Sequence, residues 1–135
     1  PYYIDGINQR NKQIIKNLNK LKPLFKDVKI KSSNAEGTIL SCKYSNQKVN
    51  EALENISLLL SDIFQKSFLI TYYKTLNQIT PNKKKQADDD QKLCIKTFSD
   101  IVKKLRTMVG RRKNYQKALD SYLFRNTMII NRLDL

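Results

Sequence analysis

Residues 92–117 read KLCIKTFSDIVKKLRTMVGRRKNYQK, and this stretch decides the fold that we expect. In an α-helix, where each residue advances by about 100°, one side of it collects large apolar side chains and the opposite side collects cations. The apolar side, which continues just beyond the stretch, comprises Phe98, Ile101, Leu105, Met108 and Leu119. The cations that share about 100° of arc are Lys92, Lys96, Lys103, Arg106, Lys113 and Lys117. One face is therefore expected in a core, and the other can bind an anion.

Three more cations flank this stripe. The full set of candidate anion-binding residues is Lys92, Lys96, Lys103, Lys104, Arg106, Arg111, Arg112, Lys113 and Lys117. Contact of such a surface with phosphates is electrostatic and carries little sequence information. Asn114 and Gln116 can read adenine edges if the helix enters a major groove, but amides at such positions are more often simply solvated.

The charge of the whole chain supports an anionic partner. Lysine and arginine number 26 against 12 acidic residues, which gives a formal net charge of +14 and a pI near 9.9. Such an imbalance causes self-repulsion in the folded state, and nucleic acid, either DNA or RNA, commonly compensates it. An acidic protein is the next candidate, while a membrane is disfavoured because the apolar residues lie opposite the stripe. The alternative is a solvated lysine surface of the kind that an AT-rich genome supplies.

The N-terminal part predicts a helix over residues 5–22. Its apolar positions recur at spacings of seven, four and three, and they are Ile7, Ile14, Leu18, Leu21 and Phe25. We expect Pro23 to end or bend this helix, because proline lacks the backbone N–H group that the helix needs.

The period then changes from helical to alternating. Val28 and Ile30 alternate with lysines, and a second alternating run ends at Tyr44. Gly37 can supply a positive φ in the turn between them. We therefore expect a small β-hairpin at about residues 28–44 that packs on helices, because a lone hairpin is marginal in water. An irregular loop is the alternative.

A second helix is expected from an N-cap at Ser45 or Asn46 towards Pro81. Its runs Leu-Leu-Leu and Phe-Leu-Ile are apolar nearly all round, which indicates a central helix buried on several sides. Its great length also allows a break near Ser67. The residues of its apolar side are Val49, Ala52, Leu53, Ile56, Leu60, Ile63 and Ser67.

Two further boundaries complete the fold. Residues 80–90, TPNKKKQADDD, lack a large apolar side chain, and we expect a mobile loop whose aspartates precede a helix N-terminus. Gly110 either ends a helix at Val109, with a further helix over residues 111–133 and Asn126 in its seam, or is tolerated within one long helix.

We predict a single, mainly α domain over residues 1–135, which can be a fragment of a larger protein. Its fold is an antiparallel bundle of four to five helices with the hairpin appended.

Catalytic chemistry is mostly excluded. The chain has no histidine, so the usual general base and the usual metal ligand are missing. It contains no glycine-rich phosphate loop, and its two cysteines, Cys42 and Cys94, lack metal-binding spacing. We read both cysteines as buried apolar residues in a reducing compartment, and we expect no enzyme, cofactor or metal. The N-terminus lacks a signal-peptide pattern, and two short basic tracts resemble nuclear-localisation signals, so an intracellular, nuclear protein is expected.

Three segments resemble the N-terminal domain of the transcription elongation factor TFIIS, a family that includes integrase-binding domains. They are Val-Asn-Glu-Ala-Leu at residues 49–53, Leu-Ile-Thr-Tyr-Tyr-Lys-Thr-Leu at residues 69–76, and Ile-Lys-Thr-Phe-Ser-Asp-Ile-Val-Lys-Lys-Leu at residues 95–105. The resemblance covers residues 45–110, without the tryptophan often found in the family's last helix. It implies a helical bundle that binds short acidic, disordered motifs in transcription factors.

These observations lead to two hypotheses. The first is a non-enzymatic module whose basic helical face contacts nucleic-acid phosphates within a nuclear, chromatin or transcription assembly. The second is a protein-interaction subunit of a larger complex, which binds a partner helix or an acidic disordered motif. Its candidate contact residues are Leu58, Leu59, Phe64, Phe68, Ile129 and Ile130.

Overall fold

The computed structural model describes residues 2–33, 41–76 and 78–135, with side chains from residue 8 onwards except residues 32–42 and 77. Its helices are α1 (Tyr2–Phe25), α2 (Gln47–Lys74), α3 (Pro81–Val109), α4 (Lys113–Tyr122), the short 3-10 helix η1 (Phe124–Asn126) and α5 (Thr127–Arg132). Its strands are β1 (Ile30–Ser33) and β2 (Ser41–Tyr44). The fold is therefore mainly α with a small hairpin, as the sequence predicts.

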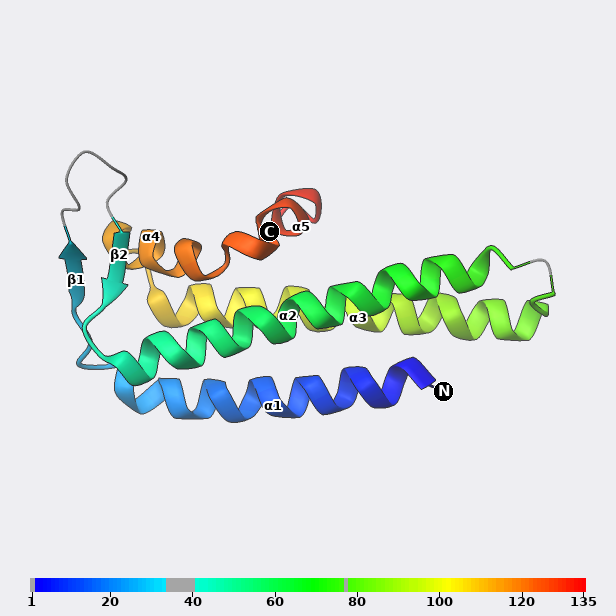
Figure 1. The fold of residues 1–135 in the computed structure, drawn as a ribbon, viewed down its shortest axis with the longest axis horizontal. Helices are drawn as coiled ribbons and strands as arrows, with labels where there is room; N and C mark the ends of the chain where they lie inside the picture. The colour runs from blue at the N-terminus through cyan, green and yellow to red at the C-terminus, as the bar shows by residue number, and fades with distance from the viewer. Residues whose placement is uncertain (1, 34–40, 77) are drawn as a thin grey trace.

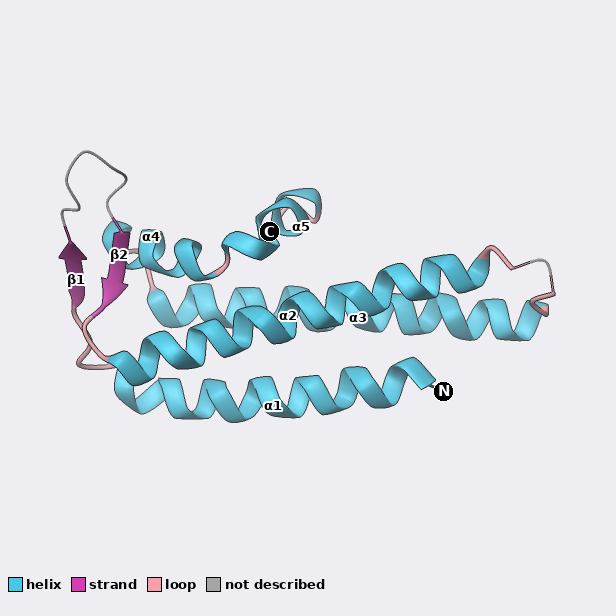
Figure 2. Ribbon diagram, in the orientation of Figure 1, coloured by secondary structure: helices cyan, strands magenta, loops and turns pink. Residues whose placement is uncertain are grey.

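The three long helices lie side by side along the long axis of the molecule (Figure 1). The α2–α3 pair extends beyond the N-terminus of α1, and the hairpin and α4 lie at the opposite end (Figure 2). Helix α2 packs on both α1 and α3, and α4 crosses back towards the middle of the bundle. Within the described part of the chain, no helix is long and apolar enough to cross a membrane.

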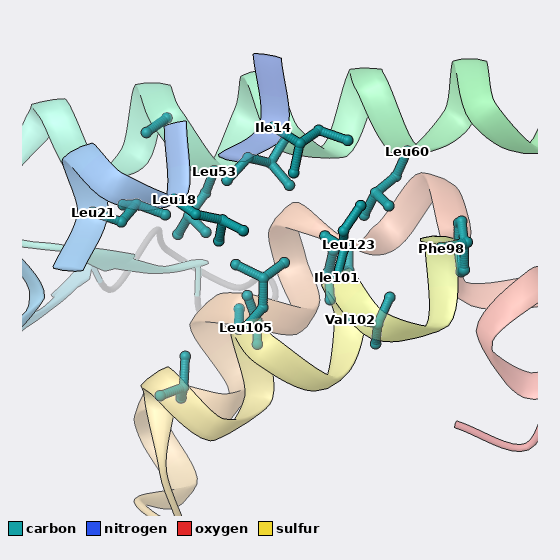
Figure 3. Close-up of a cluster of buried hydrophobic side chains, with 14 of the residues drawn as sticks. Ile14, Leu18, Leu21, Leu53, Leu60, Phe98, Ile101, Val102, Leu105 and Leu123 are labelled. Atoms are coloured by element: carbon teal, nitrogen blue, oxygen red, sulfur yellow. The ribbon is translucent and has the colours of Figure 1, made fainter. Parts of the chain in front are cut away.

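The core lies between these helices (Figure 3). Along the interface of α1 with α2, Leu21 lies towards Leu53 and Ile14 lies nearer to Leu60. Helix α3 contributes Phe98 and other apolar residues. The predicted apolar side of α2 is buried as far as Ile70, which confirms the helical periodicity read from the sequence, but its expected continuation is not, because Tyr73 is half-buried and Leu76 is exposed beyond the helix end. Its buried members are Val49, Ala52, Leu53, Ile56, Leu60, Ile63 and Ser67.

Helix α1 is longer than predicted. It runs to Phe25, so the expectation that Pro23 ends it is wrong. The proline lies in the last turn, where its missing N–H removes one hydrogen bond. Leu21 and Phe25, on either side of it, are both buried in the core, and their burial maintains the helical path.

The predicted hairpin is confirmed, with Ile30 opposite Tyr44 in an antiparallel register. Tyr44 attaches it to the bundle, because the buried ring lies 5.0 Å from that of Phe25 and the hydroxyl donates to the Tyr115 carbonyl oxygen at 2.6 Å. The Tyr115 hydroxyl in turn donates to the Val28 carbonyl oxygen at 3.1 Å. These contacts supply the packing that an isolated hairpin lacks. The predicted turn glycine, Gly37, lies outside the described residues.

Helix α2 begins as predicted but ends earlier. Asn46 is its N-cap, and its side chain accepts a hydrogen bond from the Lys48 backbone N–H at 2.9 Å. The helix continues through Ser67 and ends at Lys74, so both the break near Ser67 and the extension towards residue 81 are wrong. The prediction that α2 is buried on several sides is correct only in part, because several of its apolar side chains are exposed. They are Leu58, Phe68, Leu69 and Tyr72.

The predicted mobile loop over residues 80–90 is wrong, because α3 begins at Pro81. Thr80 is the N-cap, and its side chain accepts from the Lys83 backbone N–H at 3.3 Å. The three aspartates that we placed before a helix lie inside this one. Polar contacts to α2 hold the segment: the Lys74 ammonium lies 2.8 Å from an Asp88 carboxylate oxygen, and Gln91 donates to Ser67 and Thr71.

Gly110 ends α3 as the first of our alternatives predicts, with φ of 74°. The helix expected over residues 111–133 is divided into α4, η1 and α5. Asn126 lies at the boundary between η1 and α5, where its fully buried side chain donates to the Ser57 carbonyl oxygen at 3.2 Å and accepts from the Ser61 hydroxyl at 3.0 Å. Asn126 therefore lies in the seam, as expected, but it joins two short helices to α2.

Candidate anion-binding surface

The predicted stripe is divided between two helices. Its first four cations lie on α3, but Lys113 and Lys117 lie on α4, which follows the turn at Gly110 and runs back across the bundle. The interpretation of residues 92–117 as one helical face is therefore wrong at its C-terminal end. Lys92, Lys96, Lys103 and Arg106 remain on α3, all exposed and within about 80° of arc.

The row of lysines on α3 also extends in the other direction. Because α3 begins at Pro81, Lys85 joins Lys92, Lys96 and Lys103 on one exposed line of about 40°. We call these four residues the lysine row. At about 1.5 Å per residue, it spans about 27 Å. Sequence reasoning missed Lys85 because residues 80–90 lack apolar periodicity, although Thr80 followed by Pro81 was a signal of a helix N-terminus.

A groove lies beside the C-terminal end of the row, between α1 and α3. Its volume is about 460 Å³. We call it the basic groove, and its lining residues are Ile15, Leu18, Asn19, Lys22, Lys103, Lys104, Thr107 and Met108. The three lysines are exposed, whereas Leu18 is buried and Met108 half-buried. Lys103 and Lys104 were predicted, but Lys22 of α1 was not, because only the packing of α1 on α3 brings it there.

The charges around these residues are not all positive. Every charged residue that lines the basic groove is a lysine. Asp89 and Asp100, however, are exposed on α3 within about 60° of the centre of the lysine row. They lower the local potential, and they offer positions where the charge of this face can be increased by substitution.

Arg106 differs from the lysines of the row. Burial raises the pKa of the nearby Asp120 carboxyl group, and the positive charge of Arg106 opposes that rise. The charge of Arg106 therefore lies close enough to a carboxyl group of α4 to attract it, without an ion pair between the two in the described part of the chain. We consequently place Arg106 at the edge of the candidate surface.

The remaining predicted cations surround the turn between α3 and α4. The Arg112 guanidinium lies 3.6 Å from the centroid of the Tyr115 ring, a cation–π contact that attaches the turn to α4. Arg111, Lys113 and Lys117 are exposed. The Gln116 side chain donates to the Gly110 carbonyl oxygen at 3.0 Å, and both Gln116 and Asn114 belong to α4. The two amides considered for base reading therefore do not lie on the helix that carries the lysine row.

Cys94 is confirmed as a buried residue on the core side of α3. It is a free thiol, and burial, followed by the charge of Asp90, raises its pKa to about 11. Such a thiol is protonated and weakly nucleophilic at neutral pH. The side chain of Cys42 lies outside the described residues.

Comparisons of this chain with protein families, with curated proteins and with solved structures found no match. The resemblance to the TFIIS N-terminal domain therefore remains a prediction.

Proposed function

We propose that this chain is a non-enzymatic binding module whose lysine row and basic groove contact nucleic-acid phosphates in a nuclear assembly. The observation that carries the proposal is that exposed lysines from α1 and α3 gather on one side of the bundle. Lys22 and Lys104 line the groove with Lys103, which is also the last member of the row. Phosphate chains are the partners whose charge repeats over such a distance.

The energetic basis of this binding is counterion release. A lysine that neutralises a phosphate releases a condensed cation, so affinity falls with salt in proportion to the number of such contacts. Lysine acts as a point charge and carries no sequence information when it contacts phosphate. The proposed binding is therefore strong at low salt, weak at high salt and indifferent to sequence.

The test is fluorescence anisotropy with labelled duplex DNA, single-stranded DNA and RNA at two salt concentrations. We expect Lys103→Glu/Lys104→Glu to weaken binding by at least about tenfold at low salt. The matched control is Lys16→Glu/Lys20→Glu, which changes the net charge equally but lies at the opposite side of α1, in the groove that faces α2. Equal losses in the two variants would indicate a non-specific charge effect, and the absence of all binding at low salt would refute the proposal.

Exposed apolar side chains favour protein interaction as a second candidate function. Four of them lie on the last turns of α2 and in the turn after it. Phe68 is 58% exposed, Leu69 46%, Tyr72 69% and Leu76 44%. Such a patch is typical of a site for a partner protein. Of the residues first considered for this role, Leu58 and Phe68 are exposed, but Ile130 is buried and is excluded.

This second candidate is tested with a labelled amphipathic peptide that has an acidic polar face. We expect Phe68→Ser/Tyr72→Ser to weaken its binding, because the apolar face of a partner helix would lose its contact. Unchanged affinity would count against the patch as a contact surface.

A further inference from the structure

We infer that the lysine row is adapted to a double-stranded nucleic acid, which it binds through phosphates without sequence preference. This inference rests on the proposed function and names the substrate class of the same surface. Three features of the described residues carry it: the straightness of the row, the composition of the groove beside it, and the location of the exposed aromatic side chains.

The row is rigid and straight because one uninterrupted helix carries all of it. Helix α3 runs from Pro81 to Val109, and its exposed lysines recur at intervals of seven, four and seven residues. The intervals correspond to about 10, 6 and 10 Å along the helix axis. A duplex presents its phosphates at fixed positions over a comparable length, so both partners are ordered before they meet.

A flexible single strand fits this surface less well. Ordering a single strand along a straight helix has an entropic cost, which single-strand-binding proteins offset by stacking bases on aromatic rings. Here the apolar side chains that line the groove are the aliphatic residues Ile15, Leu18 and Met108.

The exposed aromatic residues belong to other helices. Among residues whose side chains the structure describes, the large exposed aromatics are Phe68 and Tyr72 of α2 and Phe124 of η1. None of these three belongs to α1 or α3. Among the described side chains, therefore, the helices that carry the lysine row and the basic groove present no exposed aromatic ring on which the bases of a single strand could stack.

Sequence preference is not expected either. The outward side chains of the row are lysines, which contact phosphates as point charges. Asn114 and Gln116, the amides that could read base edges, belong to α4, and Gln116 is bonded to Gly110. The duplex would therefore be recognised by its charge and by the spacing of its phosphates.

The experiment compares two DNA duplexes of unrelated sequence, one RNA duplex, and the separate strands of each, all of equal length. We expect the two DNA duplexes to bind within about twofold of each other, and at least one type of duplex to bind at least about fivefold tighter than its strands. The kind of duplex that binds more tightly than its own strands identifies the substrate as DNA or RNA. Neutralising two row members with Lys92→Gln/Lys96→Gln should reduce the slope of log affinity against log salt by about 2.

The outcomes separate this inference from the proposed function. Single strands that bind as tightly as the duplexes, or a tenfold preference for one DNA sequence, would overturn the inference while leaving phosphate binding intact. An unchanged salt slope in Lys92→Gln/Lys96→Gln would remove the row from the interface. Failure of every nucleic acid to bind at low salt would overturn both.

Discussion

The two halves of α3 are held to the bundle by different forces. Residues 94–109 bury apolar side chains, among them Phe98, Val102 and Leu105, against the other helices. Residues 81–93 bury only Ala87 and Asp90, and polar contacts with α2 hold them. One continuous helix thus combines a segment anchored by the hydrophobic effect with a segment anchored by hydrogen bonds and an ion pair.

This difference matters for the candidate surface. Hydrogen bonds and partly exposed ion pairs contribute little net free energy, because water competes for the same groups. The polar half of α3 should therefore open locally at a lower free energy than the apolar half. Lys85 and Lys92 lie on the polar half, so the rigidity of the lysine row depends on its less stable segment.

The largest expected effect is in the apolar half. Phe98→Ala removes a fully buried ring that lies 6.2 Å from the ring of Phe64, and it should lower the free energy of unfolding by about 3–5 kcal/mol. Urea denaturation measures the change. The control is Ile95→Ala on the same helix, where the side chain is already 36% exposed and less apolar contact is lost. Similar losses in both variants would contradict the assignment of the core to the Phe98 side.

A smaller effect is expected in the polar half. Thr80→Ala removes the N-cap of α3, and the local opening free energy of residues 81–93 should fall by about 1 kcal/mol, which accelerates amide exchange there about fivefold. Hydrogen–deuterium exchange provides the measurement, and the amides of residues 97–105 in the same variant serve as the internal control. Equal acceleration in both segments would show that α3 opens as a single unit.

The same contrast explains which elements could be predicted from the sequence. Apolar periodicity identified the buried faces of α2 and of the second half of α3, because burial of a stripe requires that spacing. The loop assigned to residues 80–90 was wrong because the polar half of α3 is held by Lys74 and by the polar groups of Ser67 and Thr71, which lie 14 to 24 residues away in the chain. Such pairings between helices leave no periodic signal in the sequence.

The sequence likewise predicted only part of the candidate anion-binding surface. Exposed cations on α3 follow from the helical spacing alone, so Lys92, Lys96 and Lys103 were identified correctly as one face. The sequence could not show that Gly110 redirects the chain and removes Lys117 from this face. It also could not show that α1 places Lys22 beside Lys103, since that juxtaposition depends on tertiary packing.

The smallest expected effect concerns two carboxyl groups, Asp88 on the polar half of α3 and Asp120 on α4, the helix that follows its apolar half. The hydrogen bond from Lys74, with its charge, lowers the pKa of Asp88 below 3.8 in the folded state. Its stabilising contribution is therefore present above that value and is lost as the pH falls through the folded pKa. Partial burial instead raises the pKa of Asp120, an α4 residue whose side chain keeps contact with solvent. Its unfavourable contribution is absent at low pH and develops as the pH rises through the raised pKa.

Substitution of each carboxyl group by an amide should therefore change stability in opposite directions. Near pH 7, Asp88→Asn should destabilise the protein, and Asp120→Asn should stabilise it; each difference should shrink as the pH falls through the folded-state pKa of that carboxyl group. Urea denaturation between pH 2 and pH 7 measures the two profiles. Destabilisation by Asp120→Asn near pH 7 would mean that the attraction between Arg106 and Asp120 exceeds the cost of the partial burial of that carboxylate. In that case the charge of Arg106 would be compensated by Asp120 of α4, and Arg106 would not belong to the anion-binding surface.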